Sequence, residues 1–391
     1  MWRNSIRASS TFCSSLRKTC LHDFHVRKGG KMVEFAGYSM PVQYSDMGIA
    51  DSHRHTREGV SIFDVSHMLQ TEIQGKCAVE FMESMIVGDI KNLSDNTGTL
   101  SLFTNESGGI VDDLICNKIS DSTLYVVSNA GRRNEDQALM EENMKRFRSR
   151  GKNVSMREME EVALLAIQGP KAATILESLV EGLDLSELKF MRGGVGTVAG
   201  IPKCRITRCG YTGEDGVEIS VPVESAEHVA EAVLEAGGSD AALAGLGARD
   251  SLRLEAGLCL YGNDIDETTT PVEAVLLWTV AKNRRLPGAF PGVEVIMQQI
   301  KQKPVRKRVG FVSTGPTPRQ GAPIFSSDNP NEPIGVVTSG CPSPSLGGNV
   351  GMGYIPWSMA QVSTELRAQV RGRMVPIVVS KMPFVPTKYY M

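Results

Sequence analysis

Two adjacent carboxylates stand where a chain could use them for proton transfer. The segment 105–114 reads Asn-Glu-Ser-Gly-Gly-Ile-Val-Asp-Asp-Leu, so a glycine turn leads into a predicted strand. On that strand Val111, Asp113 and Ile115 share one face, and Asp112 lies on the other. A carboxylate among apolar neighbours is desolvated, which raises its pKa and suits it to proton transfer, unless a cation or hydrogen-bond donor meets it. Taken alone, the Asp pair is more simply read as the closure of a hairpin.

A second candidate is the glycine-rich segment 208–220, Arg-Cys-Gly-Tyr-Thr-Gly-Glu-Asp-Gly-Val-Glu-Ile-Ser. Its glycines allow the backbone to approach a ligand closely, and Tyr211 offers an aromatic face. Glu218 lies on the strand that follows, between two apolar residues. The spacing matches neither a phosphate loop nor a dinucleotide fingerprint. An ordinary hairpin is the alternative.

Arginines form a third candidate. Arg249 and Arg253 are four residues apart on a predicted helix and therefore share a face, from which they could clamp a carboxylate. The alternative is a solvated face with ion pairs to Asp250 and Glu255. A further basic cluster, with five Lys or Arg residues within 301–308, is either ordinary surface or a contact for an acidic partner.

Composition narrows the function class. The chain of 391 residues has 42 Lys and Arg against 44 Asp and Glu, a formal charge of -2 that argues against nucleic-acid binding. No apolar run approaches the roughly 20 residues of a membrane span, so we expect no membrane insertion. Eight cysteines without a paired motif indicate a reducing compartment, and neither they nor the six histidines have metal-ligand spacing. We therefore expect no metal.

The amino-terminal residues differ from the rest of the chain. Residues 1–20 hold four basic and no acidic residues and are rich in Ser and Thr. This composition is typical of a mitochondrial transit peptide, which we place at 1–21. A basic tail that targets nothing is the alternative.

The periodicity of the remaining chain predicts an α+β fold followed by a small barrel. Between 22 and 285, short alternating strands mix with amphipathic helices, one of which carries Met140, Met144 and Phe147 on one stripe. No regular strand–helix–strand repeat occurs, which favours antiparallel sheets. In 286–391, closely spaced strands separated by Gly and Pro predict a β-barrel, with strands at 308–313, 334–339, 350–355, 364–370 and 375–380. We place the domain boundary near residue 285.

Together these motifs carry a resemblance. The chain is similar to the aminomethyltransferase (T-protein) family of the glycine cleavage system over residues 22–391. The motifs that carry the resemblance include Phe-Asp-Val-Ser-His-Met at 63–68, the glycine-Asp-Asp run at 108–114, the segments 209–218, 248–257, 261–264 and 338–346, and the tail 381–390.

The resemblance implies a reaction and its partners. Family members take the one-carbon unit of an aminomethyl group carried on the lipoyl arm of H-protein and transfer it to tetrahydrofolate. The products are 5,10-methylenetetrahydrofolate, ammonia and the dihydrolipoyl carrier. Tetrahydrofolate is thus the implied co-substrate, and lipoate belongs only to the partner. The resemblance also implies glycine decarboxylase and dihydrolipoyl dehydrogenase as members of the same system, in the mitochondrial matrix.

The resemblance also assigns roles to residues. Asp113 matches the catalytic aspartate, which acts either as a proton acceptor or as an orienting group. Glu218 matches the residue that holds the polar edge of the pterin. The other matched binding positions are Tyr211, Arg249, Tyr389, Asn129, Met68, Leu100 and Val127.

Two other functions remain open at this stage. Folate-dependent demethylases resemble the chain only in their carboxyl-terminal part and carry a preceding flavin domain, for which we see no room or fingerprint here. Non-catalytic folate-binding proteins of the same superfamily are the other alternative. The combination of Asp113, Glu218 and Arg249 disfavours them.

Overall fold

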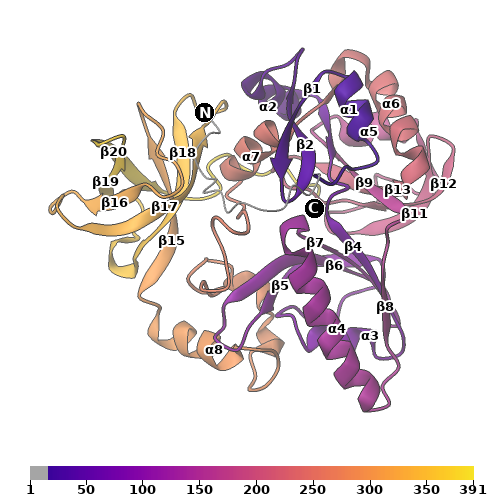
Figure 1. The fold of residues 1–391 in the computed structure, drawn as a ribbon, viewed down its shortest axis with the longest axis horizontal. Helices are drawn as coiled ribbons and strands as arrows, with labels where there is room; N and C mark the ends of the chain where they lie inside the picture. The colour runs from indigo at the N-terminus through magenta and orange to yellow at the C-terminus, as the bar shows by residue number, and fades with distance from the viewer. Residues whose placement is uncertain (1–15) are drawn as a thin grey trace.

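The computed structural model describes residues 16–391. Figure 1 shows an amino-terminal region of sheets and helices beside a separate barrel, with helix α7 (Leu246–Glu255) between them. The α+β region followed by a barrel is the architecture predicted from the periodicity. Within the described residues, no helix is long and apolar enough to cross a membrane.

A seven-stranded sheet forms the first layer. Its only parallel pair is β3 with β14. Two helices, α5 (Ala172–Glu177) and α6 (Ala226–Gly237), cover one face of this sheet. In order across the sheet, the strands are β10 (Val180–Glu181), β11 (Gly193–Val198), β12 (Ile201–Thr207), β13 (Gly216–Pro222), β9 (Val162–Gln168), β3 (Val60–Asp64) and β14 (Ala241–Leu243).

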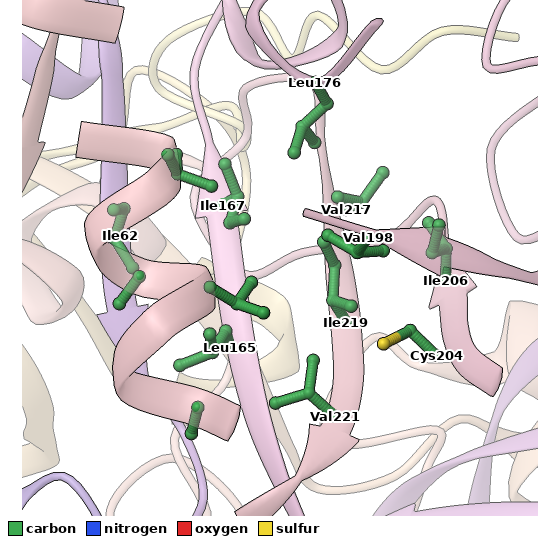
Figure 2. Close-up of a cluster of buried hydrophobic side chains, with 14 of the residues drawn as sticks. Ile62, Leu165, Ile167, Leu176, Val198, Cys204, Ile206, Val217, Ile219 and Val221 are labelled. Carbon is green, nitrogen blue, oxygen red and sulfur yellow. The ribbon is translucent and has the colours of Figure 1, made fainter. Parts of the chain in front are cut away.

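Strand β9 is apolar along most of its length because both of its faces are buried. Leu165 and Ile167 point into the core beneath α5 and α6, where Figure 2 shows them among other branched side chains. Leu164 and Ala166 point the other way, into a second core. Each fully buried Leu or Ile side chain contributes roughly 1.5–3 kcal/mol. The sheet is therefore held from both sides.

A five-stranded antiparallel sheet forms the second layer and carries the Asp pair. Its strands run in the order β5 (Thr97–Thr104), β6 (Ile110–Ser120), β7 (Thr123–Ser128), β4 (Leu69–Gln74) and β8 (Ser155–Glu158). Helices α3 (Ala78–Glu83) and α4 (Arg133–Ser149) pack on one face. Met140, Met144 and Phe147 of α4 are buried there, which confirms the predicted stripe.

The second core joins the two sheets to α7. Phe63 and Leu164 of the seven-stranded sheet meet Tyr125 and Val127 of the five-stranded sheet, together with Leu252 of α7. The remaining elements of this region are α1 (His22–Arg27), β1 (Gly30–Phe35), β2 (Tyr38–Tyr44), α2 (Ile49–Glu58), η1 (Ala130–Arg132), η2 (Val223–Ser225) and η3 (Gly238–Asp240).

The chain reaches the barrel through η4 (Leu277–Thr279), η5 (Lys282–Arg284) and α8 (Val293–Gln302). The closed barrel has six antiparallel strands in the order β15 (Arg306–Ser313), β18 (Asn349–Pro356), β17 (Pro333–Pro342), β16 (Pro323–Ser326), β19 (Glu365–Val370) and β20 (Arg373–Ser380). A short η6 (Trp357–Met359) follows β18. Five of the strands match the predicted ones, and the four-residue β16 was not predicted.

Buried ionic groups fasten the barrel to α7. The carboxylate of Glu255 accepts hydrogen bonds from His53 Nε2 (3.0 Å), Arg57 Nη2 (2.9 Å) and the hydroxyls of Ser343 (2.5 Å) and Ser345 (2.7 Å). Both serines belong to the barrel loop after β17. The relative placement of barrel and α7 is therefore fixed by a carboxylate that has no access to water.

The carboxyl-terminal tail crosses back over the amino-terminal region. The backbone N–H of Phe384 donates to Glu255 O (2.8 Å), and that of Lys388 donates to Gly213 O (2.8 Å). The backbone N–H of Phe190 donates to Tyr390 O (2.7 Å). The last residues thus lie against the glycine-rich turn that precedes β13.

Candidate active site

Asp113 lies on the face of the five-stranded sheet that points away from α4. Leu100 of β5 pairs with Ile115 of β6, and Ile115 pairs with Val127 of β7, so these three side chains form a row across the sheet. Asp113 is two residues from Ile115 and shares its face, whereas Asp112 points to the opposite side. The predicted alternation is confirmed, and it brings Leu100, Val127 and Asp113 together.

Asn129 orients the Asp113 carboxylate. Its side-chain Nδ2 donates to Asp113 Oδ1 (2.9 Å), to Asp113 O (3.1 Å) and to Asp112 Oδ1 (2.9 Å). Its backbone N–H donates to Asp112 Oδ2 (3.0 Å). Asn129 therefore contacts both members of the Asp pair, and within the described residues no protein donor is recorded for the second oxygen of Asp113.

The environment raises the pKa of Asp113 to about 7. Burial is the main cause, the charge of Asp112 adds to it, and the hydrogen bond from Asn129 acts in the opposite direction. A carboxyl group that titrates near neutral pH can both accept and return a proton under physiological conditions. This is the property that the sequence predicted for a desolvated aspartate.

Glu218 faces a small cavity between the two sheets. On β13 it pairs with Thr207 of β12 and with Ala166 of β9. Burial raises its pKa, and Arg249 partly offsets the effect. The cavity is lined by Ile115, Asn117, Tyr125, Val127, Leu164, Arg205, Thr207, Cys209 and Glu218. Since Ile115 and Val127 belong to the same face as Asp113, the cavity continues that face.

Arg249 enters the same site from α7. Its Nη1 is buried and has no hydrogen-bond partner among the described residues. Its guanidinium lies over the Tyr211 ring, with Cζ 5.0 Å from the centroid. Burial lowers the pKa of Arg249, and the negative charge of Glu218 partly offsets this, so the two side chains interact electrostatically.

The second arginine of α7 does not join Arg249. Arg253 is fully buried and donates to Asp250 (2.8 Å), Asp264 (2.6 Å) and Ser339 Oγ (2.8 Å). The predicted arginine pair is wrong as a clamp, because the barrel and the loop at 264 satisfy Arg253. Of the two α7 arginines, Arg249 is the one with a buried donor that has no partner among the described residues.

Tyr211 connects the arginine to the aspartate. Its hydroxyl donates to the carbonyl oxygen of Cys259. Burial raises its pKa, and Asp113 contributes to the same direction. The ring therefore contacts Arg249 on one face and is close enough to Asp113 for the two groups to influence each other.

The two remaining predicted residues lie at the margins. Met68, in the loop before β4, is partly buried against the core that contains Val127. Tyr389 of the tail stacks on Phe190, with centroids 4.2 Å apart and an interplanar angle of 18°. Burial raises the pKa of Tyr389 to about 12. Its position next to Cys209 and Arg57, which also influence that pKa, places it beside the glycine-rich turn.

The basic cluster at 301–308 is partly internal. Arg308 is buried and donates to Ala274 O (2.8 Å), and Arg306 Nε donates to Glu273 (3.0 Å). Lys301 and Lys303 are exposed. Two of the five cations therefore hold the barrel to the segment before it and are not available to a partner.

Sequence reasoning missed Asp136, which lies next to Asp112. It precedes Met140 and Met144 by four and eight residues, and therefore lies on the buried stripe of α4. A carboxylate at an apolar stripe position was the signal that could have found it. For metals, the described residues contain no group of three or more His, Cys, Asp or Glu side chains arranged to hold an ion.

Comparisons with known proteins agree with this architecture. The family model "GCVT N-terminal domain" matches residues 21–284, and "Glycine cleavage T-protein C-terminal barrel domain" matches residues 306–386. The chain therefore belongs to the glycine cleavage T-protein family. It has the activity of that family: it is an aminomethyltransferase of the glycine cleavage system.

Relatives extend over almost the whole chain. The human protein named "Aminomethyltransferase, mitochondrial" is 56% identical over 375 residues, which cover 96% of this chain and 91% of the relative. The mouse protein of the same name is 54% identical over 384 residues, covering 98% and 94%. A crystal structure of aminomethyltransferase T from Bartonella henselae superposes with a TM-score of 0.88 at 39% identity, covering 96% of this chain and all of that one. Like its mammalian relatives, the chain is mitochondrial.

Proposed function

We propose that the site formed by Asp113, Glu218 and Arg249 binds tetrahydrofolate and transfers to it a one-carbon unit from the aminomethylated lipoyl arm of H-protein. The observation that supports this most directly is the buried, unpaired Nη1 of Arg249 in the same site as Glu218. A buried donor without a partner is costly, and a ligand acceptor would remove that cost. A folate offers both donors for Glu218 and acceptors for arginine.

Glu218 would hold the pterin and Arg249 an acceptor of the ligand. A carboxylate can accept two parallel N–H bonds from the aminopyrimidinone edge, which fixes the ring plane. The planar Arg249 guanidinium can donate in the same way to a carbonyl or carboxylate. The walls of the folate site would be formed by Tyr211, Met68, Leu100 and Val127. Asn129 would supply a polar contact, and Tyr389 of the tail would lie at the edge of the site.

The transfer balances without an external oxidant or reductant. The methylene carbon loses its bonds to sulfur and to the amino nitrogen, and it gains bonds to two folate nitrogens. Each of those nitrogens gives up one proton, and the thiolate and the departing amine each gain one. Asp113, with a pKa near 7, would accept a proton from a folate nitrogen and return it to a leaving group.

The chain divisions follow from the same proposal. The α+β region, 22–285, would carry the folate site, and 286–391 would carry the barrel and the tail. Residues 1–15 of the predicted transit peptide lie outside the described residues. Leu21 is buried, and the backbone N–H of Arg17 donates to Gly37 O (3.0 Å). Cleavage after residue 21 would remove these contacts, whereas cleavage before Arg17 would keep them. We therefore propose that the transit peptide ends before Arg17 and directs the protein to the mitochondrial matrix.

An assay with purified components tests the function. Aminomethylated H-protein and tetrahydrofolate are mixed with the protein, and ammonia and methylenetetrahydrofolate are measured. We expect both products to form in equal amounts and much faster than without protein. Equal rates with and without the protein would reject the proposal. Glycine decarboxylase and dihydrolipoyl dehydrogenase are the further partners that we propose within the same system.

A further inference from the structure

Behind Asp113 lies a pair of buried carboxyl groups that contribute no atom to the site itself. Asp112 of β6 and Asp136 of α4 are both fully buried. Asp112 accepts hydrogen bonds on both oxygens, from the backbone N–H and the Nδ2 of Asn129. The hydroxyl of Ser128 and the carboxyl group of Asp112 lie close enough to Asp136 to interact with it, but among the described residues neither Asp136 oxygen receives a well-formed hydrogen bond.

Two buried carboxylates next to each other cannot both be ionised. Burial raises the pKa of Asp112 well above its ordinary value, and the neighbouring Asp136 adds to that effect. Burial likewise raises the pKa of Asp136 to about 6. A shared proton gives Asp136 a hydrogen bond that the Ser128 contact alone does not supply, and it removes the repulsion, because one carboxyl group then donates to the other.

The charged groups around the pair leave this arrangement intact. Asp113 disfavours ionisation of Asp136, and Arg132 of η1 favours it. However, Arg132 already forms ion pairs with Glu267 and with Glu135 (3.4 Å). Tyr261, the remaining titratable neighbour, lies close enough to Asp112 for the two to influence each other. No cation faces the pair without a carboxylate of its own within the described chain.

We propose that Asp112 and Asp136 share a single proton, and that Asp136 is a positioning residue that holds Asp113 in its reactive orientation through Asp112 and Asn129. The inference rests on the proposed function of Asp113. The proton-sharing pair keeps one negative charge, which accepts both N–H groups of Asn129. The side-chain amide of Asn129 is then fixed, because turning it over would place its oxygen against three acceptors.

Holding Asn129 also determines which oxygen of Asp113 is used. Because Nδ2 of Asn129 donates a hydrogen bond to Oδ1 of Asp113, Oδ2 of Asp113 is the oxygen that remains for the substrate. Without Asp136, Asp112 alone would compete with Asp113 for one proton. A protonated Asp112 would turn an O–H toward the donors of Asn129. The helix α4 thereby controls a side chain on the far face of the sheet.

Infrared difference spectroscopy detects the shared proton directly. The full-length protein is labelled with aspartate carrying carbon-13 in its carboxyl group and studied at about pH 8, where ordinary aspartates are ionised. We expect a labelled carbonyl band of a protonated acid that persists in Asp113→Asn and disappears in Asp136→Asn. Absence of the band in the unmodified protein, or its persistence in Asp136→Asn, overturns the proposal.

Turnover then tests the positioning role. Asp136→Asn restores a donor to Asp112 and should keep kcat within about threefold, whereas Asp136→Leu removes it and should lower kcat about tenfold or more, with little change in the Michaelis constant for tetrahydrofolate. The pH dependence of kcat should also shift in Asp136→Leu, since Asp112 and Asp113 then compete for the proton. Equal kcat values and pH profiles in the two variants contradict the positioning role.

The two proposals fail in different ways. If the unmodified protein shows no transferase activity, the proposed function is rejected, and the infrared band still reports the shared proton. If activity is present and the band is absent, only the inference about Asp136 is rejected. If Asp136→Leu does not fold, the spectra of the unmodified protein, Asp113→Asn and Asp136→Asn still show whether Asp112 and Asp136 share a proton.

Discussion

The guanidinium of Arg249 lies over the ring of Tyr211, with its Cζ 5.0 Å from the ring centroid. The ring holds the guanidinium plane without using its N–H groups, so Nη1 remains unpaired although it is buried. A cation oriented by an aromatic face and not by a carboxylate keeps its donors for a ligand. This contact therefore distinguishes Arg249 from Arg253, whose donors are bound to Asp250, Asp264 and Ser339.

Replacing Arg249 should weaken folate binding. We expect Arg249→Gln to raise the Michaelis constant for tetrahydrofolate about tenfold or more, as for the loss of a charge-assisted hydrogen bond, with a smaller effect on kcat. Steady-state kinetics with saturating H-protein measure both constants. Arg54→Gln, at an exposed ion pair with Asp51, serves as the control and should change neither. Unchanged folate kinetics in Arg249→Gln would show that the arginine does not contact the substrate.

Asp113→Asn should abolish turnover while leaving folate binding largely intact. The amide keeps the shape of the carboxyl group and can still accept the hydrogen bond from Asn129, but it cannot take up a proton. Equilibrium titration with tetrahydrofolate and single-turnover product formation separate binding from chemistry. Full turnover in this variant would reject the catalytic role of Asp113.

The same substitution should stabilise the protein at alkaline pH. The pKa of Asp113 is about 7 in the folded chain and about 4 when unfolded, so the folded state binds the extra proton between these values. Stability contributed by this group is therefore complete below about pH 4 and falls as the pH rises through 7. Since three pKa units correspond to about 4 kcal/mol, we expect Asp113→Asn to be more stable than the unmodified protein by up to about 4 kcal/mol at pH 8 and equal to it near pH 4. Urea unfolding at the two pH values measures the difference, and exposed Asp328→Asn should show none.

Glu255→Gln should loosen the barrel from α7. Burial alone would raise the pKa of Glu255, but the hydrogen bonds from His53 and Ser343 lower it to about 2. Its stabilising contribution is thus present above about pH 4 and is lost as the pH falls toward 2. At neutral pH we expect a loss of about 3 kcal/mol, because Arg57 and His53 lose a buried charged partner. Glu231→Gln, at the exposed ion pair with Lys28, is the matched control, and calorimetry that finds equal effects would contradict the assignment.

The exposed part of the basic cluster offers a test of H-protein docking. The double variant Lys301→Glu, Lys303→Glu should raise the Michaelis constant for H-protein in a salt-dependent way and leave that for tetrahydrofolate unchanged. The double variant Lys145→Glu, Arg150→Glu, at two exposed positions on α4 and at its end, provides a charge-matched control. An effect on folate kinetics alone would mean that this surface does not meet the carrier.

Local patterns predicted much of this fold because their physical causes are local. The α4 stripe, the alternation around Asp113 and five of the six barrel strands follow from periods of 3.6 and 2 residues, which the sequence displays directly. The strand β16 has only four residues, and although it pairs with the next strand, β17, its other partner, β19, lies far along the chain, so its local pattern is too short to mark it.

The site was predicted less completely, because partners distant in the sequence decide the state of each side chain. Arg249 and Arg253 share one face of the helix, and contacts with other segments distinguish them: Asp264 and Ser339 bind Arg253, whereas Arg249 lies over the Tyr211 ring. Asp136 has no motif of its own, and its importance depends on the position of Asp112 across the sheet–helix interface. The resemblance to a family predicted site residues that periodicity could not predict.

The tail that ends beside the glycine-rich turn has a consequence for how the protein is made. Synthesis delivers Asp113, Glu218 and Arg249 well before Tyr389, and the hydrogen bonds that Phe384, Lys388 and Tyr390 make to the first region can form only when the tail is present. A chain that is released early carries every polar group of the proposed site but lacks its final wall. The last few residues therefore close the proposed site only after all of its polar groups have been made.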